Sequence, residues 1–124
     1  MILNKHNILT YLYILKESRD KYEIIKYIFR RMMGIRAKFA RDVTIRSDGL
    51  LFNCGRIMEN CTVACSAFEK NIFKGVILSD GIFIDVGAHI GKHSLHIAKQ
   101  YPAINVISIE DSQDTFKLLK QNIE

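Results

Sequence analysis

The spacing of hydrophobic and polar residues changes along the chain, and each spacing predicts a different element. Residues 5–17 and 20–33 have the spacing of amphipathic helices. In the second segment, apolar residues recur at i, i+3, i+4, i+7 and i+8, which defines one apolar face: Ile25, Ile28, Phe29, Met32 and Met33. We expect this face to pack on the rest of the protein, and we expect Gly34 to end the helix.

Residues 43–54 have the pattern of a β-hairpin. Asp48 and Gly49 form a typical two-residue turn, and β-branched or aromatic residues flank it. The following stretch, residues 61–78, is expected to pass from a short strand into a helix that contains Glu69.

From residue 82 the pattern alternates strand, helix, strand, helix. The first apolar run, residues 82–86, is typical of a strand buried on both faces of a parallel sheet, and residues 104–109 form a second strand. On the helices we expect apolar faces formed by two sets of residues, Leu95, Ala98 and Tyr101 on the first and Phe116, Leu119 and Ile123 on the second. Ser112 is a suitable N-cap for the second helix. The segment therefore predicts a β-α-β-α unit with parallel strands and a right-handed crossover.

The chain of 124 residues is expected to contain a helical segment, 1–40, and a partial α/β domain, 41–124. Residues 1–46 carry 11 Lys/Arg and 4 Asp/Glu, whereas residues 47–124 carry 7 and 9. Because the basic excess lies away from the glycine-containing part, we expect no nucleic-acid binding there.

Three cysteines without a C-x-x-C pair, Cys54, Cys61 and Cys65, are expected to be reduced, partly buried thiols of a cytoplasmic protein. No uncharged apolar run is long enough to predict a transmembrane helix.

Candidate ligand-binding residues gather where the two strands end. Asp85, Gly87 and Gly91 follow the first strand, and Glu110 follows the second. Ligands of open parallel sheets bind at this edge, and an acid after the second strand can accept hydrogen bonds from ribose hydroxyls. Asp85 could instead cap the following helix. The G-x-G-x-x-G dinucleotide motif fails because His89 and Lys92 occupy positions that need small residues, and a Walker loop fails in its spacing.

The stretches "FIDVGAHIGKHSL" and "VISIEDSQDTFKLLKQNI" resemble the FkbM-type family of S-adenosylmethionine-dependent methyltransferases. The family pattern is F-I-D-V-G-A-N-I-G-x-x-S/T, then a strand ending in Glu, then a helix of the type F-x-x-L-x-x-N-I. Its counterparts here are residues 83–91 with Ser94, then Glu110, Phe116, Leu119, Asn122 and Ile123. The resemblance covers residues 43–124 and implies a doubly wound, Rossmann-like sheet.

The resemblance also implies roles for individual residues. Asp85 and the backbone of Gly87 and Ala88 would border the methionine end of the cofactor, Glu110 would hold the ribose, and Glu69 would help to hold the amino group. His89 stands where the family has Asn, and Asp111 stands where it has Pro, which places a second negative charge beside the adenosine site. The methyl acceptor would be a hydroxyl of a sugar or another small molecule.

His89, His93 and His96 are spaced so that they could share one helix face, but no nearby acid completes a metal site, and we expect none. The family's sheet has about seven strands, so the chain is expected to be a truncated methyltransferase that is inactive alone and associates with itself through an exposed sheet edge. The alternative is a helical interaction module, or a membrane-surface module acting through residues 1–34, with a vestigial α/β tail.

Overall fold

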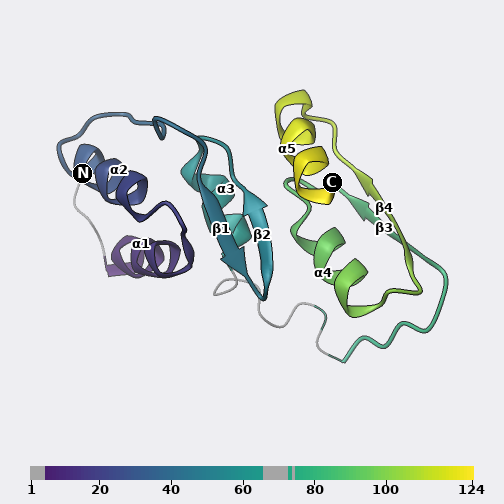
Figure 1. Cartoon of the computed structure of the whole chain (residues 1–124). Coiled ribbons are helices and arrows are strands. Elements are labelled where there is room, and N and C mark those ends of the chain that lie inside the picture. Colours follow the sequence, from purple (N-terminus) through teal and green to yellow (C-terminus); the bar gives the residue numbers. More distant parts are fainter. Residues whose placement is uncertain (1–4, 66–72, 74) are drawn as a thin grey trace. The chain divides into compact units, whose positions relative to one another are not determined.

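The computed structural model describes residues 5–65, 73 and 75–124, which form helices and two small sheets of a mixed α/β protein (Figure 1). The chain divides into an N-terminal unit, Met1–Phe68, and a C-terminal unit, Glu69–Glu124. The first contains α1 (Lys5–Glu17), α2 (Lys21–Met32), β1 (Thr44–Ser47), β2 (Leu50–Asn53) and α3 (Met58–Ala64). The second contains β3 (Ile82–Val86), α4 (Lys92–Gln100), β4 (Asn105–Ile109) and α5 (Gln113–Ile123).

The division falls after the hairpin, whereas the sequence pattern placed a boundary at residue 40. The hairpin belongs with the helices because β1 contacts both α1 and α3, and Ser18 pairs with Ile45 in an isolated bridge. Asp20, between the two helices, accepts a hydrogen bond from the Thr44 amide at 2.9 Å and pairs with Arg41 at 3.3 Å. The buried core of this unit includes Ile14, Ile24, Val43, Ile45 and Phe52.

The predicted hairpin is confirmed. Strands β1 and β2 pair antiparallel, with Ser47 opposite Leu50, and Asp48 and Gly49 have φ values of +48° and +78°. A two-residue turn with positive φ at both positions matches the right-handed twist of the strands it joins.

Helix α2 is turned differently from the prediction. Its buried residues are Glu23, Ile24 and Tyr27, whereas most of the predicted apolar face is exposed. The tertiary partners explain the difference, because the Tyr27 ring packs on Phe39 at 5.1 Å and the Glu23 carboxylate accepts a hydrogen bond from the Ala40 amide at 3.1 Å. These contacts draw a polar and an aromatic residue inward in place of the aliphatic face.

The short strand expected at residue 61 is instead the second half of α3. Met58, Cys61 and Ala64 are buried at helical spacing, and the Asn60 amide donates to the Cys54 carbonyl at 3.0 Å. The helix expected to follow lies largely outside the described residues.

The three thiols form no disulfide, as predicted, and they are fully buried, whereas the sequence predicted partial burial. A hydrogen bond with the Cys61 thiol, together with burial, raises the pKa of Cys54 far above its ordinary value.

In the C-terminal unit the predicted order of elements is confirmed. Strands β3 and β4 are parallel, paired from Ile82 opposite Asn105 to Val86 opposite Ile109, and α4 packs against both. Burial on both faces of β3 was wrong for the described structure. Ile82, Ile84 and Val86 are 57–76% exposed, because α4 packs on the opposite face of the two strands.

The helices of this unit also bury fewer apolar residues than expected. Helix α4 buries Ser94 and Ile97, while Ala98 is exposed, and α5 buries Leu119 but leaves Phe116 and Ile123 about half exposed. The inward position of Ser94 follows from its hydrogen bonds, described below. No helix among the described residues is long and apolar enough to cross a membrane.

Candidate functional site

The loop at residues 87–91 connects β3 to α4 and is fixed against the end of β4. The amides of Gly87 and Ala88 both donate to the Ile109 carbonyl, at 2.8 and 2.9 Å. Gly87, His89 and Gly91 have φ values of +77°, +52° and +88°. The chain therefore reverses within five residues and turns its backbone toward the carboxyl edge of the sheet.

The two glycines of this loop serve different purposes. A Cβ on Gly91 would lie 2.8 Å from Cδ1 of Leu119, so the glycine permits close approach of α5. A Cβ on Gly87 would meet nothing within 4 Å. Gly87 is therefore required by its positive φ rather than by a close contact, and it borders open space at the loop.

Asp85 is directed into the layer between sheet and helix. Its Oδ2 accepts hydrogen bonds from the Ser94 hydroxyl at 2.6 Å and from the Ser94 amide at 3.1 Å. The Ser108 hydroxyl donates to the Ser94 oxygen at 2.7 Å, and Ser94 is only 2% exposed. Asp85 therefore binds an amide in the first turn of α4, which is the capping role that the sequence left open. Through Ser94, the hydrogen bonds of Asp85 and Ser108 connect this helix to both strands.

Glu110 is directed onto the glycine loop. Its Oε2 accepts a hydrogen bond from the His89 amide at 2.8 Å, and its Oε1 accepts one from the Ser112 amide at 3.0 Å. The side chain is half-buried. The structure thus brings Glu110 to residues 87–91, as expected, whereas the hydrogen bonds of Asp85 lead to α4 rather than to the same place.

Helix α5 supports the loop from its other side. The predicted N-cap is confirmed, because the Ser112 hydroxyl oxygen accepts a hydrogen bond from the Thr115 amide at 3.4 Å. At the C-terminal end of the helix, the Asn122 side-chain amide donates to the Ile90 carbonyl at 2.9 Å. Leu119 and Asn122, known from the sequence only as parts of a motif, are therefore the residues that hold α5 against the loop.

The three histidines have separate surroundings. His89 occupies a left-handed backbone position, which Asn and His adopt more readily than most residues, and its buried Nδ1 has no hydrogen-bond partner among the described residues. The His93 ring packs edge-on against Phe73 at 5.3 Å, and the His96 Nδ1 lies 2.7 Å from the Lys92 carbonyl oxygen. Within the described part of the chain, no group of three potential ligands could hold a metal ion.

The structure describes only one of the two other predicted site residues. Glu69 lies outside the described residues, and Asp111 is exposed beside Glu110. Ser108 was missed by the sequence reasoning. Its signal was a polar residue within the apolar second strand, on the face opposite Ile107 and Ile109.

A cleft of about 260 Å³ lies between β4 and α5. Val106 and Ser108 line it from the strand, and Phe116, Leu119, Lys120, Ile123 and Glu124 line it from the helix and its end. The half-exposed apolar residues of α5 therefore face this open space.

Comparison with protein-family models gives no match. Comparisons with curated proteins and with solved structures give none either.

Proposed function

We propose that the C-terminal unit binds S-adenosylmethionine as the donor half of an FkbM-type O-methyltransferase with a partial doubly wound, Rossmann-like sheet. The observation that carries the proposal is the hydrogen bond between the Glu110 carboxylate and the His89 amide, at 2.8 Å. It joins a strand-end acid to the glycine loop after the neighbouring parallel strand, which is where such sheets bind nucleosides.

Glu110 retains the capacity to bind a ribose while it holds the loop. A carboxylate has about four acceptor positions, and the two protein amides use one on each oxygen. The second position on each oxygen would accept a hydrogen bond from one ribose hydroxyl. Ribose binding therefore requires no break in the contacts that fix the loop.

The loop residues also fit a nucleoside cofactor. Gly87 borders open space, and the buried Nδ1 of His89 needs a polar partner that the described residues do not supply. We assign the loop backbone at Gly87 and Ala88 to the methionine end, with Glu69 near the amino group. Asp85 acts as a positioning residue that fixes the first turn of α4.

When bound, the cofactor would supply a sulfonium methyl group for transfer to a hydroxyl oxygen of a sugar or other small molecule. Glu110 would hold its ribose, and the backbone of Gly87 and Ala88 would border its methionine end. Alignment of the acceptor with the S–CH₃ bond provides much of the rate, so donor binding is part of the mechanism.

On its own, this chain would bind the cofactor weakly and would not turn over. The described sheet of the C-terminal unit has two strands, so the donor loop is supported from few sides. Its exposed residues Ile84, Val86 and Ile107 favour association with another chain. The buried thiols form no disulfide, which supports a cytoplasmic location as a further part of the proposal.

Calorimetric titration of the full chain with S-adenosylmethionine and with adenosine tests this site. We expect both to bind, and we expect Glu110→Gln to weaken both about tenfold, because the amide retains one acceptor oxygen where the ribose needs two. Asp114→Asn, on the exposed first turn of α5, is the control and should leave both affinities unchanged. Equal losses in the two variants, or no binding at millimolar ligand, would refute the site.

A further inference from the structure

Helix α2 exposes an apolar face that the N-terminal unit leaves uncovered. Ile25, Phe29 and Met32 are 53–62% exposed, and Met33 at the helix end is 61% exposed. At 100° per residue these positions lie on one side of the helix, opposite the buried Ile24 and Tyr27. The face is continuous along the helix, unlike hydrophobic residues that are scattered singly over a surface.

The charged residues around this face have one sign. The only acid of α2, Glu23, is buried and bound to the Ala40 amide, with Lys26 at 3.8 Å. Lys21 lies at one edge of the apolar face, and Lys26 and Arg30 lie at the other edge, all exposed. An apolar strip bordered by cations complements a surface that is apolar inside and anionic outside.

Helix α1 extends the same surface. Ile8 and Leu12 are exposed on α1, and together with Tyr11, Leu15 and Ile28 they line a groove of about 220 Å³ between the two helices. Ile28 belongs to α2 and lies one turn from both Ile25 and Met32. The apolar surface therefore continues from the face of α2 across the groove to α1.

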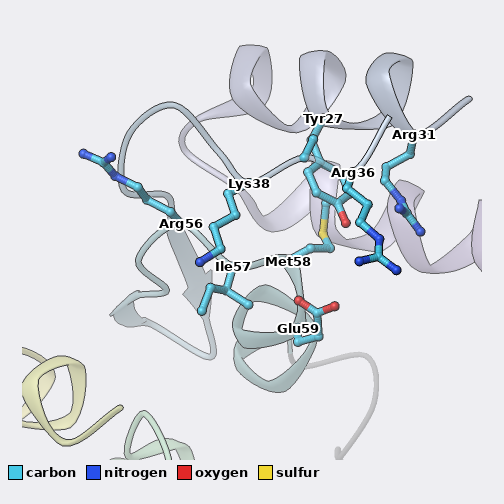
Figure 2. Close-up of a pocket in the computed structure, with 9 residues that line it drawn as sticks. Tyr27, Arg31, Arg36, Lys38, Arg56, Ile57, Met58 and Glu59 are labelled. Atoms are coloured by element: carbon cyan, nitrogen blue, oxygen red, sulfur yellow. The ribbon is translucent and has the colours of Figure 1, made fainter. Parts of the chain in front are cut away.

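A basic cavity lies on the other side of α2, where Tyr27 is buried, and is therefore separate from the apolar face. It has a volume of about 520 Å³ and is lined by Tyr27, Arg31, Arg36, Ala37, Lys38, Arg56, Ile57, Met58 and Glu59. Figure 2 shows Arg36 extending toward Glu59, whereas Arg56 points to the other side. Four cations and one acid favour an anionic group, and guanidinium groups are well suited to phosphate.

We propose that α1, α2 and Met33 form a docking surface for a bilayer containing anionic phospholipids. The apolar side chains enter the boundary between headgroups and acyl chains, while Lys21, Lys26 and Arg30 at the edges of the face bind lipid phosphates. This surface lies entirely within the N-terminal unit, so lipid binding can be tested independently of cofactor binding.

Vesicle sedimentation with the full chain tests the charge part of the proposal. We expect binding to phosphatidylserine-containing vesicles, little binding to pure phosphatidylcholine, and weakening with salt. The double variant Lys26→Gln/Arg30→Gln should reduce partitioning about 25-fold, from about fivefold for each cation.

The control removes the same charge elsewhere. Arg46→Gln/Lys99→Gln changes exposed residues on β1 and α4, and it should change partitioning by less than about twofold. Equal losses in the two double variants would mean general attraction of a basic chain, which would overturn the proposal.

Fluorescence tests the insertion of the apolar face. The protein contains no tryptophan, so Phe29→Trp introduces a single reporter within the face, and Phe116→Trp places one on α5 as a control. We expect a blue shift and quenching by brominated lipids for Phe29→Trp alone.

Three outcomes would overturn the proposal. The first is an unshifted spectrum for Phe29→Trp, and the second is an equal shift in both variants. The third is occupation of the face by a second copy, seen as a dimer that Phe29→Gln converts to a monomer without any binding to vesicles.

Discussion

At the residue scale, the candidate site depends on a few backbone positions and on the side chains that fix them. Gly87 and Gly91 both require positive φ, but only Gly91 also requires the absence of a Cβ, because Leu119 lies against it. The two glycines therefore offer a matched comparison of backbone strain and steric contact.

We expect Gly91→Ala to destabilise the protein by about 3 kcal/mol, because strain in a left-handed position adds to a clash with Leu119. Gly87→Ala should destabilise it by about 1 kcal/mol, since only the backbone is strained. Urea unfolding followed by circular dichroism measures both values. Equal effects would show that the contact with α5 is unimportant.

The buried hydroxyl of Ser94 gives a second prediction. Ser94→Ala removes the hydroxyl that joins the Asp85 carboxylate to the Ser108 hydroxyl but keeps the amide bond to Asp85, and it should destabilise the protein by about 2 kcal/mol. Thr115→Ala removes an exposed hydroxyl bonded to Ser112 and serves as the control. Similar unfolding midpoints for the two variants would contradict the network.

The raised pKa of Cys54 predicts how stability depends on pH. An unfolded thiol ionises at about pH 8.5, whereas the folded Cys54 stays protonated because its pKa is raised. Above that pH, only the unfolded state releases the proton. The free energy of unfolding should therefore fall by about 1.4 kcal/mol for each pH unit above this value. Cys54→Ala should flatten that part of the curve, measured by urea unfolding at several pH values.

The sequence predicted residues whose role is local and missed those whose role depends on distant partners. The Asp48–Gly49 turn and the Ser112 cap follow from their immediate neighbours. Asp85 remained ambiguous between cap and ligand, because its partner Ser94 becomes fixed only when β4 supplies Ser108.

At the element scale, helix and strand positions were predictable from periodicity, but buried faces were not always. The prediction failed for α2 because Tyr27 and Glu23 find partners in residues 39–40, and no repeat within the helix encodes such contacts. Strand β3 read as doubly buried because its residues are apolar, although α4 packs on only one side. Periodicity thus reports which residues can be buried, and the neighbouring elements decide which are.

The contact between α5 and the glycine loop can be tested at this scale. Asn122→Ala removes the hydrogen bond to the Ile90 carbonyl and should accelerate amide hydrogen exchange in residues 87–91 by about tenfold, for a loss of about 1.4 kcal/mol. Lys117→Ala, exposed on the same helix, should leave these rates unchanged. Unaltered exchange in Asn122→Ala would show that α5 does not hold the loop.

At the scale of the whole molecule, two compact units present two separate surfaces. The C-terminal unit offers a glycine loop with an acid beside it, and the N-terminal unit offers a basic, apolar helical surface. We propose a methyl-donor site on the first and a lipid-docking surface on the second. A protein that combines them would act on hydroxyl groups close to a membrane.

The most direct test of the donor site is an amide NMR titration of the full chain with S-adenosylmethionine. We expect shifts concentrated at residues 87–91 and 110–112, with the largest at the His89 amide that Glu110 holds. Shifts confined to residues 5–65, or unchanged spectra at millimolar cofactor, would contradict the proposed site.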